Sequence, residues 1–493
     1  MNYVSTRGAA ERVSSAYAIK TGLAADGGLY MPESIPTLTD GELRTLAELS
    51  YPERAARILA KFLTDYTYDE LLEDARSAYS SEKFGAEAAP VTDLGDGMYM
   101  LELWHGPTCA FKDMALQIMP RLFSRALAKT GEKRTALILV ATSGDTGKAA
   151  LEGYRDVEGT KIQVFYPVDG VSRVQKMQMQ TQEGANVSVS AIVGNFDDAQ
   201  SGVKRIFASE EMRAALSERG VFLSSANSIN WGRLVPQIVY YISAYCDLAK
   251  NGKIAFDEKI DVTVPTGNFG NIFAAFIAKN MGLPIEKLIC ASNKNNVLTE
   301  FLATGTYDKN REFHATISPS MDILISSNLE RLLYLTAGPE RTAEYMRELS
   351  DSGKYTVSKA DFDKIKAHFV GYFTDEDGTR ETIKSIYENK NCLIDTHTAV
   401  ALSASYRYRG GNKAERKILT ISTASPYKFA CDVYASLTGG AATGELEALD
   451  ELKELTGVAI PCPLAALKGK PVLHTNVIEG CAMESAVKEF AGK

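Results

Sequence analysis

The spacing of apolar residues changes near residue 95 of this 493-residue chain. Between residues 34 and 84, apolar side chains recur three or four positions apart, which predicts amphipathic helices. The side chains that show this spacing are Leu43, Leu46, Leu49, Ile58, Leu59 and Phe62. The turn-rich stretch AEAAPVTDLGDG at 86–97 marks a boundary. We therefore predict an N-terminal helical domain over residues 1–95 and a larger region over residues 96–493.

Beyond this boundary, short β-rich runs, the first of them apolar throughout, alternate with helical segments. The runs are ALILVA (136–141), IQVFYP (162–167), NVSVSAIV (186–193), FLSSA (222–226), DVTVP (261–265), KLICAS (287–292) and KILTIS (417–422). This alternation predicts an α/β fold whose mostly parallel sheet is covered on both faces. Residues from about 328 to 392 are charged and have a helical pattern, so we interpret them as a helical insertion into the larger region.

Composition narrows the class of protein. Hydrophobic residues make up 45% and charged residues 24% of the chain, a globular balance, and the length suggests two or three domains. The formal net charge of -8 argues against nucleic acid as a partner, because nucleic-acid binders carry a basic face. We find no apolar run of about 20 residues to span a membrane and no apolar stretch typical of a secretory signal. A cytoplasmic protein is the resulting expectation.

Cysteine and histidine spacing gives no sign of a metal site. The seven cysteines are scattered and never form a C-x-x-C pair, which favours reduced thiols over a disulfide framework. The five histidines lie far apart and show no H-E-x-x-H spacing. We therefore expect no metal.

The first candidate for chemistry is the segment DVTVPTGNFGN, which begins at residue 261. A predicted strand ends at Pro265, a loop with Gly267 and Gly270 follows, and an apolar helix begins near Asn271. Amides at the start of a helix form an anion site, and a phosphate is the natural guest. A tight turn that binds nothing is the alternative. The loop matches neither the ATP-binding nor the NAD-binding glycine pattern.

A second loop, TSGDTG at 142–147, follows another predicted strand. Its hydroxyls and glycine amides suit a carboxylate or phosphate, and they belong to Thr142, Ser143, Thr146, Gly144 and Gly147. Asp145 is unusual in an anion site and makes more sense as the acceptor of a proton from a ligand hydroxyl. The alternative is an ordinary helix N-cap.

Lys112 is the third candidate, between Phe111 and Asp113 at the start of an apolar helix. Read alone, it could be a surface lysine whose stem lies along apolar side chains. A lysine desolvated by Trp104 and Phe111 would instead have a lowered pKa and a neutral amine able to form an imine. The residues themselves leave both interpretations open.

Taken together, these segments resemble the threonine synthases that depend on pyridoxal phosphate (PLP), of the long type with an N-terminal helical domain. The resemblance runs almost end to end. The strings that carry it are YVSTRG, GLAADGGLYMP, HGPTCAFKDMALQ, TSGDTGKAA, ANSINWGRLVPQIVYY, PTGNFGN, TISPSMDILISSNLERLLY, IDTHTAV and STASPYKF.

The resemblance implies a fold type II PLP enzyme, similar to the β subunit of tryptophan synthase, with two domains that contain parallel sheets. It identifies residues 1–95 as the N-terminal domain of the family and residues 96–493 as the catalytic region. Lys112 would hold PLP as a Schiff base, Asp145 would contact the phenolic oxygen, and Thr423 would face the ring nitrogen. The loop that matches the cofactor phosphate site comprises Gly267, Asn268, Phe269, Gly270 and Asn271. Ser425 departs from the family, which often has His before Pro here.

The implied reaction converts O-phospho-L-homoserine and water into L-threonine and phosphate by γ-elimination and β-addition of water. Lys112 would also be the base at Cα. For the substrate, the predicted contacts are Thr142, Ser143, Thr146, Asn230 and Arg233. A structural ion pair is the alternative for Arg233.

Two other functions stay open: a threonine-synthase-like phospho-lyase that eliminates phosphate without adding water, and a PLP-binding protein without catalysis. The intact glycine loop, Lys112, Asp145 and Thr423 argue against the second. The expected partner is a small-molecule substrate, and the expected state is a monomer or weak homo-oligomer.

Overall fold

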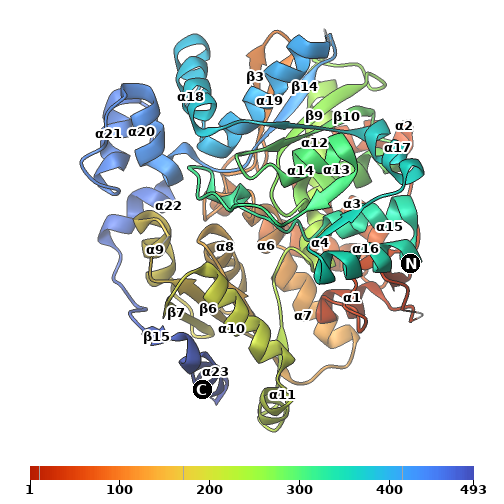
Figure 1. The fold of residues 1–493 in the computed structure, drawn as a ribbon, viewed down its shortest axis with the longest axis vertical. Helices are drawn as coiled ribbons and strands as arrows, with labels where there is room; N and C mark the ends of the chain where they lie inside the picture. The colour runs from red at the N-terminus through yellow and green to blue at the C-terminus, as the bar shows by residue number, and fades with distance from the viewer. Residues whose placement is uncertain (10, 170, 413–414, 493) are drawn as a thin grey trace.

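The computed structural model describes residues 1–9, 11–169, 171–412 and 415–492. Two open, largely parallel sheets form the centres of its two larger parts, and they lie in the upper and lower halves of Figure 1. Within the described ranges, no helix is both long and apolar enough to cross a membrane.

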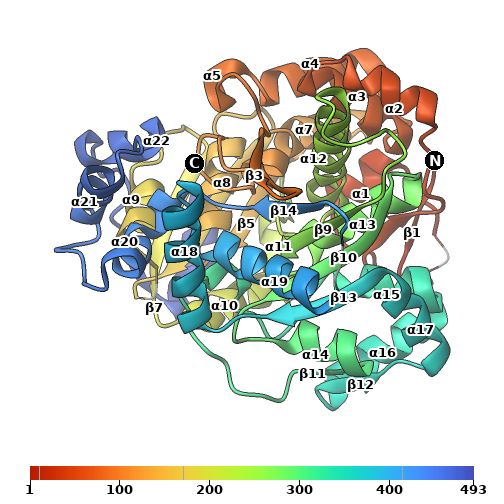
Figure 2. The ribbon, with the colours of Figure 1, turned by 90° about the horizontal axis from the view of Figure 1, so that it is seen from above.

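The six-stranded sheet has the order β13-β10-β9-β14-β4-β3, and only β3 runs antiparallel to its neighbour. Its strands are β3 (Val91–Gly95), β4 (Met98–Glu102), β9 (Ile260–Pro265), β10 (Ile285–Ser292), β13 (Phe369–Phe373) and β14 (Ile418–Ser422). Figure 2 shows α19 (Thr396–Asn412) on one side of this sheet and α12 (Trp231–Lys250) and α13 (Gly270–Met281) on the other. Because both faces are covered, β9 and β14 are buried along their whole length.

The five-stranded sheet has the order β15-β7-β6-β5-β8 and is parallel throughout. Leu137 and Leu139 on β5 pack into one apolar cluster, whereas Ile138 and Val140 pack into another on the opposite face. This alternation explains the continuous apolar run ALILVA. The strands and covering helices are β5 (Thr135–Ala141), β6 (Thr160–Pro167), β7 (Val187–Val193), β8 (Val221–Ser224), β15 (Val477–Glu479), α8 (Asp145–Tyr154), α9 (Arg173–Gln180), α10 (Phe196–Ala208), α11 (Glu210–Ser217) and α23 (Met483–Gly492).

The N-terminal part is helical, as predicted, apart from one short antiparallel pair of strands. Its capping boxes begin helices at Thr39 and Thr67, where the side chain and the third helical residue satisfy each other's free N–H groups. Its elements are β1 (Tyr3–Ser5), α1 (Ser15–Thr21), β2 (Tyr30–Pro32), α2 (Asp40–Ala47), α3 (Tyr51–Phe62), α4 (Tyr68–Ala78) and α5 (Ser81–Phe84).

The remaining elements connect these parts. They are α6 (Asp113–Leu116), α7 (Met119–Lys129), α14 (Val297–Thr304), β11 (Thr306–Asp308), η1 (Pro319–Met321), α15 (Leu329–Ala337), α16 (Pro339–Asp351), β12 (Lys354–Thr356), α17 (Lys359–His368), α18 (Glu376–Lys390), η2 (Pro426–Phe429), α20 (Ala430–Thr438), α21 (Glu447–Thr456), α22 (Cys462–Ala465), η3 (Ala466–Gly469) and η4 (Gly480–Ala482).

The predicted helical insertion at 328–392 needs a correction. Most of it is helical, but it also contains β12, which pairs with β11, and β13, which pairs with β10 at the edge of the six-stranded sheet. The sequence pattern did not reveal β13, because its central residues are only half-buried and the helices on either side of it are charged. The boundary after residue 95 stays a prediction, and β3, which precedes that boundary, already belongs to the large sheet.

Candidate active site around Lys112

Lys112 lies in a loop that is fastened to the end of the central strand β14. The backbone N–H of Phe111 donates to the carbonyl oxygen of Thr423 at 2.8 Å, and Ala110 and Ala424 form an isolated bridge. Inside the loop, Asp113 accepts hydrogen bonds from the backbone and the hydroxyl of Thr108. The sequence-predicted pair Lys112 and Thr423 is thereby brought together from positions more than three hundred residues apart.

The amine of Lys112 is buried and has two polar neighbours. Its Nζ lies 3.3 Å from Oδ2 of Asp145 and 3.2 Å from Oγ of Ser320. Burial lowers the pKa of Lys112, and the opposing charge of Asp145 only partly restores it. The desolvated interpretation of this lysine is therefore the one that the structure supports, and the surface interpretation is wrong.

Asp145 is the charged centre of the site. Burial by itself would raise the pKa of this carboxyl, but the nearby charges of Lys428 and Lys112 outweigh burial and hold the pKa well below its usual range. Lys428 Nζ lies 2.7 Å from Oδ1 of Asp145, and Gln175 Nε2 donates to the same oxygen at 2.8 Å. Asp145 is thus an ionised acceptor with fixed partners on both oxygens.

Sequence reasoning missed Lys428, although it lies in the string STASPYKF. Its side chain is fully buried, and it also donates to the carbonyl oxygen of Thr108 at 2.9 Å. The only signal in the sequence was a lysine between two aromatic residues, Tyr427 and Phe429, shortly after a buried strand. A lysine at such a position must find an anion, but the sequence does not say which one.

The glycine loop lies between β9 and α13, as predicted. Phe269 adopts a left-handed conformation with φ of 62° immediately before the helix. A Cβ atom on Gly267 would come within 2.7 Å of the carbonyl oxygen of Ser320, so only glycine fits there. The carbonyl oxygens of Gly267 and Asn268 accept hydrogen bonds from the 326–328 segment, which holds the loop from outside.

Asn271 carries a donor that lacks a partner. Its Oδ1 accepts from the hydroxyls of Tyr240 and Tyr241, whereas its buried Nδ2 has no hydrogen-bond partner among the described residues. An unpaired buried donor at the N-terminus of a 12-residue helix points to an anionic ligand. The loop therefore fits a phosphate group, and the alternative of a turn that binds nothing leaves Nδ2 unexplained.

In the loop at 142–147, one hydroxyl stabilises the turn and the others are available for further contacts. The hydroxyl of Thr142 accepts from the backbone N–H groups of Gly144 and Gly147, at 3.0 and 2.9 Å, and so shapes the turn itself. Ser143 is exposed, and the Thr146 hydroxyl accepts from Arg233 at 3.4 Å. Contacts of these residues with a substrate stay predictions.

Arg233 is buried without a carboxylate. Its guanidinium donates to the carbonyl oxygen of Ala226 at 3.0 Å and to Thr146, which uses only part of its five N–H donors. Burial lowers its pKa to about 10. Among the described residues no acidic side chain forms an ion pair with Arg233, so the alternative of a structural ion pair is wrong. Its charge acts on Lys112, whose pKa it lowers, so both belong to one site.

Asn230 lies at the start of α12, and the contact with the substrate phosphate stays a prediction for this residue. Its Oδ1 caps α12 by accepting from Gly232 N at 2.9 Å. Its Nδ2 donates to the carbonyl oxygens of Ile19 and Ser225. Because the side chain is fully buried and both ends are used, its role is to hold the start of α12 and hence Arg233.

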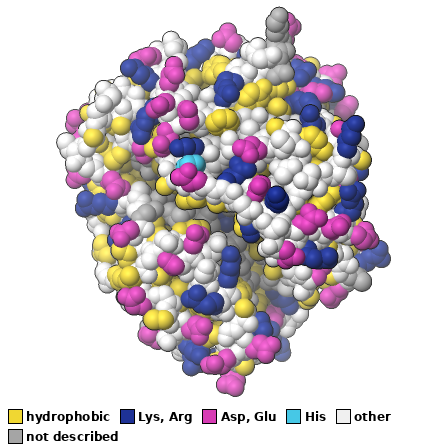
Figure 3. Space-filling view, viewed as in Figure 1, with side chains coloured by type: hydrophobic (Ala, Val, Ile, Leu, Met, Phe, Trp, Pro, Cys, Tyr) yellow, Lys and Arg dark blue, Asp and Glu magenta, His cyan; other side chains and the backbone are white. Residues whose placement is uncertain are grey.

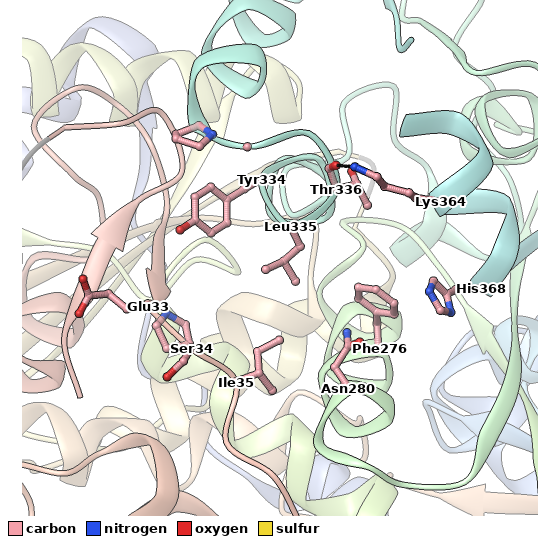
Figure 4. Close-up of a pocket in the computed structure, with 13 residues that line it drawn as sticks. Glu33, Ser34, Ile35, Phe276, Asn280, Tyr334, Leu335, Thr336, Lys364 and His368 are labelled. Carbon is pink, nitrogen blue, oxygen red and sulfur yellow. Dashed lines mark hydrogen bonds between the residues drawn. The ribbon is translucent and has the colours of Figure 1, made fainter. Parts of the chain in front are cut away.

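Figure 3 shows a hollow in the middle of the molecule, between the parts that contain the two sheets. A separate cavity of about 570 Å³ is drawn in Figure 4. Phe276 and Asn280 of α13 face it together with Tyr334, Leu335 and His368. None of the residues around Lys112 lines that cavity, so it is not the candidate active site.

Comparison with known proteins decides the family. A family model described as threonine synthase N terminus matches residues 2–79, and one described as pyridoxal-phosphate dependent enzyme matches residues 88–424. The threonine synthase of Pseudomonas aeruginosa is 40% identical over 87% of this chain and 89% of that protein. This chain belongs to the threonine synthase family. Human threonine synthase-like 1 is also 40% identical, over 85% of this chain and 57% of that protein.

Solved structures agree. A PLP-bound threonine synthase from Brucella melitensis superimposes with a TM-score of 0.89 at 37% identity and covers 100% of both chains. Threonine synthase from yeast gives 0.89 at 34% identity, covering 99% of this chain and 98% of that one. The predictions of a fold type II enzyme and of PLP as its cofactor are confirmed. The residues present fit this cofactor, because the unpaired Nδ2 of Asn271 offers a buried hydrogen-bond donor to a phosphate group.

Proposed function

We propose that this chain converts O-phospho-L-homoserine and water into L-threonine and phosphate. The observation that carries the proposal is that one site holds two separate places for an anion. The glycine loop at 267–271 with the free donor of Asn271 is the first, and buried Arg233 beside Thr146 is the second. A PLP enzyme that acts on a phosphorylated amino acid needs both, one for the phosphate of the cofactor and one for that of the substrate.

PLP would be held by Lys112, Asp145, Thr423 and the glycine loop, and it supplies a sink for the electrons released at the substrate's Cα. Lys112 would move the proton at Cα, because its amine is buried next to Asp145 and has a lowered pKa. Arg233 would hold the phosphate as the γ C–O bond breaks, when negative charge accumulates there. Its planar guanidinium suits two parallel bonds to phosphate oxygens.

The product decides between this function and its nearest rival. Purified protein incubated with O-phospho-L-homoserine should release phosphate and L-threonine in equal amounts, measured by a phosphate assay and amino-acid analysis. Phosphate with a 2-oxo acid and ammonia would identify a phospho-lyase instead, an alternative kept open by the equal similarity to threonine synthase-like 1. A cytoplasmic location and a monomeric or weakly associating state stay predictions from the sequence.

Arg233→Ala tests recognition of the substrate phosphate. Loss of one charge-assisted contact should lower kcat/KM for phosphohomoserine by about 10- to 150-fold, equivalent to about 1.5–3 kcal/mol. PLP affinity should stay unchanged, because the cofactor phosphate binds at the glycine loop.

Arg233→Lys is the matched control. It should recover only part of the rate, since the single ammonium group of lysine cannot form the two parallel hydrogen bonds that a planar guanidinium forms with a phosphate. If Arg233→Ala loses PLP or the fold and leaves the preference for the phosphorylated substrate unaltered, Arg233 is structural and the phosphate binds elsewhere.

A further inference from the structure

The short turn η1 (Pro319–Met321) contacts both halves of the site at once. Oγ of Ser320 lies 3.2 Å from the Lys112 amine. The carbonyl oxygen of the same residue lies against Gly267 of the glycine loop, where a Cβ atom would be only 2.7 Å away. The position of Ser320 therefore links the amine to the loop that we assign to the cofactor phosphate.

Ser320 is held in turn by a buried histidine. Its backbone N–H donates to Nε2 of His397 at 3.1 Å, and Nδ1 of His397 lies 2.7 Å from Oδ2 of Asp395. Because Nε2 accepts, the ring proton is on Nδ1 and is donated to the carboxylate. His397 and Asp395 are 2% and 0% exposed, so no solvent competes for these bonds.

Asp395 is itself fixed, which leaves the histidine a single orientation. Its Oδ2 accepts from the backbone N–H of His397 at 2.9 Å, and its Oδ1 accepts from the backbone N–H of Thr398 at 3.1 Å. Phe429 packs against the His397 ring with a centroid distance of 4.8 Å. The chain of contacts thus runs from the start of α19 through His397 and Ser320 to the amine of Lys112.

We infer that Ser320 is a catalytic residue that orients the Lys112 amine, and that Asp395 and His397 are positioning residues that hold Ser320. The Ser320 hydroxyl accepts a hydrogen bond while Lys112 is an ammonium and donates one when the amine is neutral. It therefore holds the amine in place before and after a proton transfer. This inference rests on the proposed role of Lys112 as the proton carrier.

The test uses the full-length protein freed of PLP. Lys112 is reductively methylated with formaldehyde and cyanoborohydride across a pH series, and its modification is followed by peptide mass spectrometry. Ser320→Ala should lower the midpoint of this reactivity by about one pKa unit, because the bond that the hydroxyl accepts from the charged ammonium is stronger than the bond that it donates to the neutral amine. His397→Leu should lower the midpoint similarly, and the double variant should show no further shift, since both act through one hydroxyl.

Two further variants separate positioning from general damage. His397→Gln, whose amide oxygen can accept the Ser320 N–H, should recover most of the midpoint. His474→Leu also removes a half-buried histidine that bonds a backbone oxygen, at 2.8 Å, and should leave the midpoint unchanged. In the loaded enzyme, Ser320→Ala should lower kcat about 10-fold or more while KM changes little.

A wild-type midpoint in Ser320→Ala, or shifts of the two single variants that add in the double variant, would overturn the inference. The labelling needs no substrate, so its outcome is independent of whether the protein makes threonine.

Discussion

Replacing Lys112 with alanine should abolish turnover of phosphohomoserine, with kcat falling by several orders of magnitude. The variant loses both the covalent attachment of PLP and the group that moves the Cα proton. It should still fold and bind PLP, more weakly, because the glycine loop and Asn271 form a separate anchor. Steady-state kinetics and PLP titration measure the two effects.

Lys112→Arg separates the amine from its charge. Arginine keeps a cation beside Asp145, but its guanidinium neither forms a Schiff base nor gives up a proton near neutral pH. It should therefore be as inactive as the alanine variant. Borohydride reduction of the wild-type protein should place the cofactor adduct on Lys112. An adduct on the neighbouring buried lysine, Lys428, or appreciable turnover by Lys112→Arg, would contradict the assignment.

Replacing Lys428 with methionine should destabilise the fold by about 1–3 kcal/mol, because Asp145 loses the closer of its two buried cations and keeps only Lys112 at 3.3 Å. Asp145 and Lys428 expose 3% and 0% of their side chains, so water cannot substitute for the missing cation. The free energy of unfolding, measured by urea denaturation near neutral pH, should show the loss.

The loss should depend on pH in a defined direction. The pKa of Asp145 is lowered in the folded protein, so its ionised form contributes stability above the carboxyl's usual pKa of about 4. That contribution falls as pH drops below this value, so the difference between wild type and variant should narrow there. The double variant Asp145→Asn/Lys428→Met also removes the carboxylate that has lost its closer cation, and it should recover part of the stability. If it is as unstable as Lys428→Met, lost packing is the cause.

The fold could be predicted from the sequence wherever the local pattern was unambiguous. The seven runs correspond to seven strands, and the pattern is clearest in strands such as β5 that are buried on both faces and are therefore apolar along nearly their whole length. Strand β4 was missed because it follows the turn-rich stretch that we took as a boundary, although it lies inside the large sheet. Strand β13 was missed because it is an edge strand between charged helices, and such a strand has no continuous apolar run.

The two loops of the site were also accessible from the sequence. Each is a short glycine-containing turn between a strand and a helix. The local pattern alone therefore predicted backbone N–H groups that can bind an anion. The interpretations of Arg233 and Asn230 as phosphate contacts stay predictions. Only the tertiary structure shows that Asn230 caps α12 and donates to the carbonyl oxygen of Ile19 in the N-terminal part.

What the sequence determined by itself was therefore the kind of fold, the family, and those parts of the site whose chemistry lies within a few consecutive residues. The tertiary structure alone decided which charges meet. Lys428 and Ser320 lie 316 and 208 residues from Lys112, yet Lys428 shares Asp145 with this amine and Ser320 contacts it directly. The pKa of a buried group depends on the side chains within a few ångströms of it, and neighbours from distant segments leave no periodic or local signal in the chain.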